Sequence, residues 1–456
     1  MPLNLALFQL REILDISPEN ILNLSVDLRM QKISTDSRNL EPGDIFLALR
    51  GESFDGHRFL EIAIQKGAIA LIVEEPLPLA KSSAVTQFVV PNTLIAYQKI
   101  AHWWRNQFQI PIVGVTGSVG KTTTKELIAA VLSKYGQVHK TEANYNNEIG
   151  VPKTLLEITT NHDYAIIEMA MRGRGEIALL TQIAQPTIGL ITNVGTAHIG
   201  RLGSEQAIAE AKCELLAEML DSSLAILNAD NERLCRTAKT VWSGQTLTYG
   251  LTQGDIRGEL LDAQTLLVEN QVFPLPLLGA HNASNYLAAL TVARVLGLDW
   301  QPFTQGLTVN LPKGRAKRDT IGTDILLLDE TYNAGLESML AALQLLQETP
   351  GQRQIAVLGA MKELGERSPE FHRRVGERVK QLGIDRLFIL ANDPEAEEIA
   401  LGAKGMTIEL FNTHEALSQR LQVFLGTGDR VLFKASHSVG LDRVVEQLRQ
   451  AEQKAI

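Results

Sequence analysis

Apolar and polar positions follow one another along this chain in a repeating order: a short apolar run, a polar turn, then apolar residues at helical spacing. The clearest block is 110–132, where the apolar run from Ile110 to Val115 ends in a glycine-rich turn before a helical pattern. Alternation of strands and helices predicts an α/β fold with parallel sheets, whose polar loops gather at one sheet edge.

The same pattern divides the chain into three units, with boundaries at 1–109, 110–313 and 314–456. A length of 456 residues agrees with three domains, at about 150 residues per domain. In the first unit we expect helices at 5–14, 57–66 and 97–107 and strands at 30–34, 44–48 and 68–73. In the second we expect strands at 110–115, 164–169, 187–193 and 223–228 and helices at 123–135, 203–220 and 281–289. In the last we expect strands at 324–328, 354–358, 386–390, 407–410 and 430–434 and helices at 339–346, 369–382 and 395–403.

The turn after the first central strand carries the clearest chemistry. Gly114, Gly117 and Gly120 precede Lys121 in a G-x-x-G-K-T core, which lacks the glycine that the general phosphate-loop pattern has six positions before its lysine. Glycines let backbone N–H groups turn toward a phosphate, and the next helix adds its own unpaired N–H groups. Lys121 can reach the outer phosphates, and the Thr122 hydroxyl can hold Mg²⁺. The strand, Lys-Thr pair and helix favour a nucleotide site over an ordinary glycine-rich turn.

Polar side chains also stand where the next central strands end. Glu168 closes one apolar run, and Asn193 and His198 follow another. Parallel strands bring these ends to one edge, so we expect all three near Lys121, with Glu168 placed as a metal-holding or water-holding acid. An ordinary loop histidine remains the alternative for His198. A solvated lysine is the ordinary interpretation of Lys212, which lies in the helix at 203–220.

Three further polar turns allow two interpretations each. Asp36, Ser37 and Arg38 suit a phosphate or sugar ligand, but also a solvated turn with a local ion pair. The asparagines within 144–147 can cap the turn or contact phosphates. Asn282, at the start of a helix, can be its N-cap or can read the edge of a base.

Composition excludes several classes of protein. The net charge of −9 argues against general affinity for nucleic-acid backbone or anionic membrane. The two cysteines, Cys213 and Cys235, have no metal-type spacing and suit a reducing cytoplasm. No apolar run approaches the ~18 residues of a membrane span. The N-terminal residues lack a basic start and a cleavage site, so we expect an amphipathic helix and no signal peptide.

Taken in order, the motifs resemble those of the Mur ligases, ATP-dependent amide-forming enzymes of peptidoglycan synthesis. The resemblance covers nearly the whole chain, and the ordered set is far more specific than any one motif. The motifs are DSR at 36–38, GVTGSVGKTT at 114–123, NYNNEIGVP at 144–152, EM at 168–169, TNVGTAHIG at 192–200, EAKCELL at 210–216, GAHNASN at 279–285, DETYNAGLESM at 329–339, VLGAMKELGERSPEFHRRVG at 357–376 and FKASHSVGLDRVV at 433–445.

This resemblance implies an α/β protein of three domains: a UDP-substrate domain, a central phosphate-loop ATPase domain and a Rossmann-like domain that closes over the nucleotide and binds a dipeptide. The implied activity joins UDP-N-acetylmuramoyl-tripeptide to D-alanyl-D-alanine through an acyl phosphate. It serves cell-wall synthesis, and with it cell shape and division, in the cytoplasm. Implied cofactors are ATP, Mg²⁺ and a carbamylated lysine. The expected partners are these small molecules, with no nucleic acid and no membrane span; the oligomeric state is left open, with a monomer expected.

The resemblance also assigns roles to residues. Those implied to bind ATP are Gly117, Ser118, Val119, Gly120, Lys121, Thr122, Thr123, Asn282, Arg315 and Asp329. Those implied to hold metal are Thr122, Glu168, His198 and carbamylated Lys212, and the last three are also implied to be catalytic together with Lys121. The UDP-substrate turn is Asp36, Ser37 and Arg38, and the dipeptide loops contribute Tyr332, Asn333, Lys434 and Ser436.

Two departures from the family pattern lie in the last unit. Gly335-Leu336 stand where Asn-Pro is usual, and His437 replaces an arginine. Both leave details of acceptor recognition open. The third residue of the peptide is open as well. The rivals are a sister ligase adding one amino acid, a folylpolyglutamate-type ligase and a phosphate-loop switch. The sister ligase that adds the third residue would carry an Asn-Pro-Arg signature, the folylpolyglutamate type would lack the DSR unit, and a switch would not need Glu168, His198 and Lys212 beside the loop.

Overall fold

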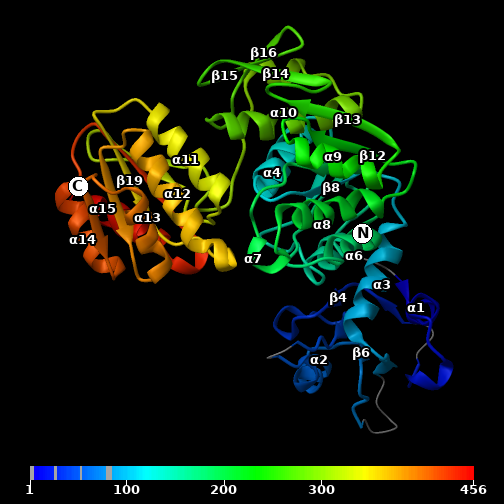
Figure 1. The fold of residues 1–456 in the computed structure, drawn as a ribbon. Helices are drawn as coiled ribbons and strands as arrows, with labels where there is room; N and C mark the ends of the chain where they lie inside the picture. Colours follow the sequence, from blue (N-terminus) through cyan, green and yellow to red (C-terminus); the bar gives the residue numbers. More distant parts are fainter. Residues whose placement is uncertain (1–4, 25–27, 52–53, 79–84, 456) are drawn as a thin grey trace.

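The computed structural model describes residues 5–24, 28–51, 54–78 and 85–455. Within these residues the strands form four sheets: one small pair and three larger sheets of five, nine and six strands. In Figure 1 the central part of the chain lies between the first and last parts, and contacts both. The α/β fold expected from the alternation of strands and helices is confirmed, with mixed rather than purely parallel sheets.

The first part packs helices on a five-stranded sheet of order β2-β7-β6-β5-β4, in which only β2 runs antiparallel to its neighbour. Its elements are β1 (Leu5–Ala6), α1 (Leu7–Leu14), β2 (Ile21–Leu22), β3 (Arg29–Met30), β4 (Ile33–Ser34), β5 (Ile45–Leu47), α2 (Leu60–Gln65), β6 (Ala70–Val73), β7 (Thr86–Val89) and α3 (Thr93–Arg105).

Several boundaries expected in this part were wrong. The helix at 5–14 begins only at Leu7, because Leu5 and Ala6 pair with β3. The helix at 57–66 is a 3₁₀ turn, Gly56–Phe59, followed by the short α2. Helix α3 begins at Thr93, where the side chain of Asn92 caps it, and strand β7 was not expected at all. Residues 1–4 of the expected N-terminal helix region lie outside the described residues.

The central part is built on a nine-stranded sheet of order β16-β15-β14-β13-β12-β11-β8-β10-β9, parallel from β9 to β14. Its elements are β8 (Ile112–Thr116), α4 (Lys121–Leu132), β9 (Val138–Lys140), α5 (Gly150–Leu156), β10 (Tyr164–Glu168), α6 (Glu176–Ala184), β11 (Ile188–Ile191), α7 (Ile199–Leu202), α8 (Glu205–Ala217), β12 (Leu224–Asn228), α9 (Glu232–Val241), β13 (Gln245–Gly250), β14 (Ile256–Asp262), β15 (Thr265–Val268), β16 (Gln271–Pro274) and α10 (Ala280–Val295).

Strand β8 is fully buried because helices cover both faces of this sheet. Its side chains alternate between two cores: Val113 and Val115 pack with α4 and α10, whereas Ile112 packs with α6 and α8. Neighbours β10 and β11 pair with β8 in parallel register, so all three end at the same edge. The phosphate-loop turn therefore lies at the carboxyl end of β8, between the ends of its neighbours β10 and β11. Open α/β sheets bind ligands at this edge.

The last part has a six-stranded sheet of order β17-β18-β22-β19-β20-β21, parallel except for β17. Its elements are β17 (Lys317–Ile321), β18 (Ile325–Asp329), α11 (Leu336–Glu348), β19 (Arg353–Leu358), α12 (Ser368–Gln381), β20 (Arg386–Leu390), α13 (Glu397–Gly402), β21 (Ile408–Phe411), α14 (His414–Phe424), β22 (Asp429–Lys434) and α15 (Asp442–Ala455). The expected parallel strands are confirmed within two residues, while β17 and α14 were not expected.

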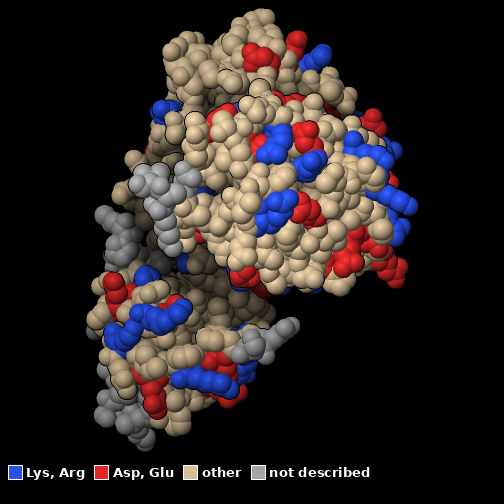
Figure 2. All heavy atoms as spheres, turned by 90° about the vertical axis from the view of Figure 1, so that its left-hand side faces the viewer, with Lys and Arg blue, Asp and Glu red and all other residues tan. Residues whose placement is uncertain are grey.

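The surface and the helices add two observations. On the face shown in Figure 2, Lys and Arg are interspersed with Asp and Glu, so that face offers no continuous basic surface for a nucleic-acid backbone.

Among the helices of the described ranges, not one has the length and apolar character required to cross a membrane.

Candidate active site

A cavity of about 600 Å³ lies between the carboxyl ends of β8, β10 and β11 and the loops of the last sheet. Its lining joins residues that are more than 300 positions apart in the sequence. Of the residues predicted to form a site, those lining it are Ser118, Val119, Gly120, Lys121, Thr122, Thr123, Glu168, His198, Asn282, Arg315, Tyr332, Asn333, Lys434 and Ser436.

The phosphate loop is held from behind by the segment after β11. The Val119 N–H donates to Asn193 Oδ1 at 3.0 Å, and the Ser118 N–H donates to the Asn193 carbonyl at 3.0 Å. The Thr192 hydroxyl donates to the Val119 carbonyl at 2.7 Å. Gly117 has φ +152°, and a Cβ there would collide with the Thr192 hydroxyl. Glycine is thus required at 117 by the close packing of the loop against Thr192.

Lys121 and Thr122 begin helix α4 directly after Gly120, whose φ is +84°. The Lys121 ammonium donates to the Gly117 carbonyl at 2.8 Å, so it lies over the loop that it is expected to serve. Burial lowers the pKa of Lys121, and the charge of Glu168 opposes that shift. The Thr122 hydroxyl donates to Glu168 Oε1 at 3.2 Å.

Glu168 is a buried carboxylate with one oxygen left over. Oε1 accepts from Thr122 and from Asn146 Nδ2, the latter at 2.8 Å. Oε2 is buried and has no hydrogen-bond partner among the described residues, and the Lys125 ammonium lies 3.8 Å from it. A buried carboxylate oxygen without a donor is the kind of group that a cation satisfies.

His198 stands at the start of α7 with φ +67°, in the left-handed region. Its Nδ1 lies 2.5 Å from Glu363 Oε2, a residue of the last part of the chain. Burial, followed by the charge of Lys121, lowers the pKa of His198 to about 4. The imidazole is therefore neutral at pH 7, which is the form that binds metals.

Lys212 lies in α8 and is only 1% exposed. Among the described residues its amine has no hydrogen-bond or ion-pair partner, and burial lowers its pKa well below the ordinary value. Lys212 does not line the cavity, but its charge reaches His198 and helps to lower the pKa of that residue. The solvated lysine that the sequence left open is therefore wrong.

The residues present suit a magnesium ion shared with phosphates. Within the described residues there is no group of three or more His, Cys, Asp or Glu side chains that could hold a metal on their own. Mg²⁺ at a nucleotide, however, takes only one or two protein carboxylates and completes its shell with phosphate oxygens and water. The unpaired oxygen of Glu168 and the Thr122 hydroxyl are oxygen donors that suit such a shell, and the neutral imidazole of His198 adds a nitrogen donor beside them.

The last part contributes a cationic and aromatic wall. The Arg315 guanidinium lies 4.1 Å above the ring of Tyr332, and its Nε is buried without a hydrogen-bond partner among the described residues. Lys434 donates to the Asn333 carbonyl at 2.9 Å, and burial lowers its pKa. Tyr332 also stacks on His437 with 5.8 Å between ring centres.

Other predicted residues lie differently. Asp329 is buried outside the lining, where it accepts from Thr331 Oγ1 at 2.6 Å and from Arg449 Nη2 at 2.9 Å. Asn282 lines the cavity, but Gly279 holds the N-cap position of α10, so the capping interpretation is wrong. The Asn282 amide instead donates to the Leu278 carbonyl at 2.9 Å.

The turn of Asp36, Ser37 and Arg38 does not line this cavity either. Its Asp36 and Arg38 form a two-point ion pair, with Nη2–Oδ2 at 2.8 Å and Nε–Oδ1 at 2.9 Å. The Arg38 hydrogen bond lowers the pKa of Asp36 to about 2. The local ion pair expected as one alternative is thus present, and 86% exposure of the Arg38 side chain leaves it accessible to a ligand.

Four residues at the site were not singled out by the sequence. Lys125 lies under the loop with its ammonium near Glu168, and Asn146 was noted only as one of several turn asparagines. Glu337 and Glu363 reach the site from the last part; both stand inside the motifs at 329–339 and 357–376, but no role was assigned to either. A strand-edge argument finds residues of one sheet, whereas these carboxylates come from another.

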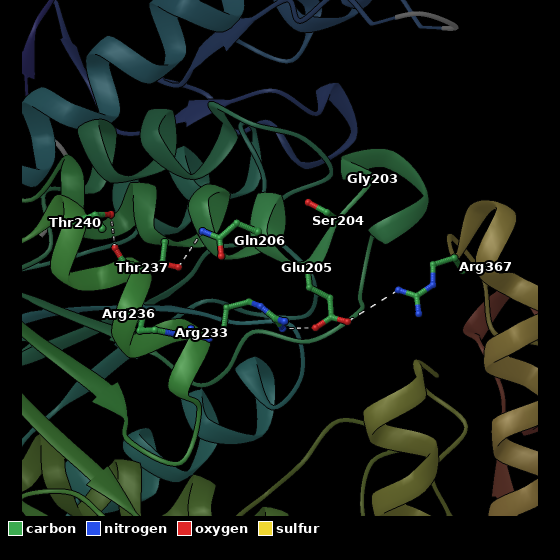
Figure 3. A pocket seen from close by; sticks show the side chains of 9 residues that line it. All are labelled: Gly203, Ser204, Glu205, Gln206, Arg233, Arg236, Thr237, Thr240 and Arg367. Carbon is green, nitrogen blue, oxygen red and sulfur yellow. Dashed lines mark hydrogen bonds and ion pairs between the residues drawn. The ribbon is translucent and has the colours of Figure 1, made fainter.

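A second cavity, of about 590 Å³, opens beside α8 and α9. It is lined by three arginines, Arg233, Arg236 and Arg367, with Glu205 between two of them (Figure 3). None of the predicted site residues lines it.

Comparison with known proteins places this geometry in a family. Three family models match in order: "Mur ligase family, catalytic domain" at 29–103, "Mur ligase middle domain" at 115–293 and "Mur ligase, glutamate ligase domain" at 317–437. A UDP-N-acetylmuramoyl-tripeptide–D-alanyl-D-alanine ligase of Synechocystis is 61% identical over 444 residues, which is 97% of each chain.

Solved structures agree along nearly all of the chain. MurF from Acinetobacter baumannii superposes with a TM-score of 0.88 at 30% identity and covers 98% of this chain and 99% of its own. MurF ligase from Thermotoga maritima, solved in complex with ADP, gives 0.84 at 32% identity, with 94% and 100% covered. Sequence and fold lead to the same conclusion: this chain belongs to the Mur ligase family.

Proposed function

We propose that this chain, an ATP-dependent amide-forming ligase, joins UDP-N-acetylmuramoyl-tripeptide to D-alanyl-D-alanine in the cytoplasm, and thereby supplies the pentapeptide precursor of the cell wall. The observation that carries the proposal is the single cavity at which the phosphate loop, Glu168 and His198 of the central part face Arg315 and Lys434 of the last part. The substrates are those named for the Synechocystis relative, and ATP is supported by the ADP complex of the Thermotoga maritima relative.

The chemistry must bring two anions together, the tripeptide carboxylate and the γ-phosphate of ATP. In the first step a carboxylate oxygen attacks the γ-phosphorus, ADP leaves and an acyl phosphate forms. In the second step the dipeptide amine attacks the acyl carbon, loses a proton and expels inorganic phosphate. Lys121 and the loop N–H groups stabilise charge on the phosphates, and Arg315 and Lys434 add positive charge from the other wall.

Magnesium would be held by Thr122 at the nucleotide and by Glu168 and His198 beside it. Bound there, it would neutralise phosphate charge as a Lewis acid. The burial of Lys212 supports carbamylation of its amine, because burial favours the neutral form that adds CO₂. The amine also has no partner among the described residues, so a carbamate there could serve as the anion near the metal. The chain's own residues then orient substrate and exclude water from the acyl phosphate.

The three parts of the chain divide the substrates among them. We assign the UDP end to 1–109, through the exposed turn of Asp36, Ser37 and Arg38. ATP belongs to 110–313, and the dipeptide to 314–456, through Tyr332, Asn333, Lys434 and Ser436. Asn282 and Arg315 are placed to contact the nucleotide, whereas Asp329 acts from outside the cavity by fixing Arg449.

Phosphate release in the presence of ATP, Mg²⁺ and UDP-N-acetylmuramoyl-tripeptide tests this assignment. We expect turnover with D-alanyl-D-alanine and little with single amino acids such as D-alanine, L-lysine or D-glutamate. Equal turnover with a single amino acid would show a sister ligase, and turnover with no amine at all would show an ATPase or switch.

A further inference from the structure

Two carboxylates of the last part hold the loop that follows β11. Glu337, in the first turn of α11, accepts from the Thr196 N–H at 2.7 Å and from its hydroxyl at 3.1 Å. Glu363, in the loop after β19, lies 2.5 Å from His198 Nδ1, and its carbonyl accepts from the Gly200 N–H at 3.2 Å. The loop that carries His198 is thus fixed by the neighbouring sheet as well as by its own.

Backbone packing makes this contact close. A Cβ added to Gly200 would lie 2.5 Å from the Gly365 nitrogen, and one added to Gly365 would lie 2.6 Å from the Gly200 Cα. Helix α7 and the 3₁₀ turn Gly365–Arg367 therefore approach without side chains between them. Glu363 itself has φ +65° and His198 φ +67°, two strained conformations that pack against each other.

The contact also decides which nitrogen of His198 is available. Nδ1 is buried 2.5 Å from Glu363 Oε2, a close charge contact without regular hydrogen-bond geometry, and it has no hydrogen-bond partner elsewhere among the described residues. The His198 side chain is nevertheless 23% exposed and lines the cavity, so its accessible nitrogen is Nε2. A carboxylate on one nitrogen of a histidine fixes the tautomer and ring orientation, and leaves the lone pair of the other nitrogen for a metal.

We propose that Glu363 is a positioning residue, supplied by the last part of the chain, that holds His198 with Nε2 directed at the metal site. The inference rests on the proposed function, in which His198 serves a magnesium ion. It adds that the metal site is complete only when the last part is docked on the central part. Metal binding and docking then favour each other by the same factor, as linkage requires.

If Glu363 served only to dock the last part on the central part, any other ion pair of that interface would matter for metal binding in the same way. The chain offers a matched control for this alternative. Arg201 also lies 3.8 Å from Glu363, so loss of the carboxylate weakens docking somewhat in any case. Arg367, two residues beyond Gly365, makes another ion pair across the same interface, 4.0 Å from Glu205 (Figure 3). No contact joins Arg367 and His198 in the described residues, so Arg367→Gln removes only one long ion pair of the interface, weakens docking slightly and leaves the imidazole in place.

The experiment titrates the full chain with Mn²⁺ in the presence of a non-hydrolysable ATP analogue, and follows free Mn²⁺ by electron paramagnetic resonance. Glu363→Met keeps the length of the side chain without an acceptor, and Glu363→Gln keeps one acceptor oxygen. We expect about 10- to 100-fold weaker binding at one site in Glu363→Met. Glu363→Gln should recover part of that loss, and Arg367→Gln should stay within about twofold of the wild type. The nitrogen coupling of bound Mn²⁺ should weaken only in the Glu363 variants.

The same titration in a His198→Ala background separates positioning from docking. Once His198 is absent, Glu363→Met should cause no further loss. Wild-type affinity in Glu363→Met, or an undiminished loss in the His198→Ala background, would overturn the proposal while amine-dependent phosphate release by the wild type still stood. Absence of histidine coupling in the wild type would overturn it too, together with the metal role of His198, whereas failure of the wild type to use D-alanyl-D-alanine would count against the proposed function alone.

Discussion

At the scale of single residues, the site is defined by groups that burial has made unusual. Within the described part of the chain, Glu168 keeps a buried oxygen without a donor, His198 is held neutral, and Lys212 is buried without a partner. The sequence indicated these residue types by their place at strand ends and in motifs. It could not show that Asp329 faces Arg449 and not the cavity, because that contact depends on helix α15, more than 100 positions away.

Gly117 tests whether the loop needs its close packing. Gly117→Ala should lower the unfolding free energy by about 1–3 kcal/mol and weaken ADP binding, because the new Cβ meets the Thr192 hydroxyl. Chemical denaturation and calorimetric ADP titration measure the two effects. Thr192→Ala in the same chain removes the collision and should restore part of the stability; an unchanged deficit would mean that backbone strain alone is responsible.

Lys212 tests the carbamate. Lys212→Ala should lower ligase turnover by about 100-fold or more, on the scale of losing one charge-stabilising group, while ADP still binds. Short carboxylic acids added to the variant should recover part of the turnover, since they return an anion to the vacated space. Full activity of Lys212→Ala would remove this residue from the site, and loss without rescue would favour a packing role.

His281, which lines the cavity, gives the fold a pH dependence. Burial lowers its pKa from 6.5 to about 4, so the unfolded chain binds a proton between these values and the folded chain does not. Its contribution to stability is therefore complete above pH 6.5 and is lost as the pH falls toward 4, by at most about 3 kcal/mol. Urea denaturation of His281→Gln should show a flatter decline over this range; an identical decline would assign it to other groups.

At the scale of elements, the strand–loop–helix units could be predicted, but the hydrogen bonds that hold their loops in place could not. Strands β8, β10 and β11 could be predicted because a strand buried on both faces needs a continuous apolar run. Helix α4 could be predicted from the glycine-rich turn before it. The role of Asn193 was visible only as convergence toward the loop. Its amide pairs with both backbone groups of Val119, an arrangement that depends on register between two strands.

Asn193→Ala should loosen the loop without unfolding the sheet. It leaves the Val119 N–H and carbonyl without these partners, so we expect a loss of about 1–3 kcal/mol in stability and about tenfold in ADP affinity. Asn92→Ala is the matched control: it removes the N-cap of α3, costs about 1 kcal/mol and should leave ADP affinity unchanged. Similar ADP affinity in both variants would show that the loop holds its shape without Asn193.

At the scale of the whole molecule, function depends on how separate sheets meet. Composition and alternation predicted an α/β chain, and the ordered motifs predicted its family, which the comparisons confirm. The contacts of Glu337 with Thr196 and of Glu363 with His198 could not be predicted, because no periodicity within one element encodes the docking of another. The antiparallel strands β14–β16 and β17 were likewise absent from a pattern read for parallel units.

The central claim is that the γ-phosphoryl group passes to the tripeptide carboxylate. Its most direct test uses UDP-N-acetylmuramoyl-tripeptide labelled with ¹⁸O in that carboxylate, together with ATP, Mg²⁺ and D-alanyl-D-alanine, and mass analysis of the phosphate released. The acyl phosphate keeps one carboxylate oxygen as the bridge to phosphorus, so each turnover should deliver one ¹⁸O to phosphate. Phosphate free of label, with the pentapeptide still formed, would contradict the account.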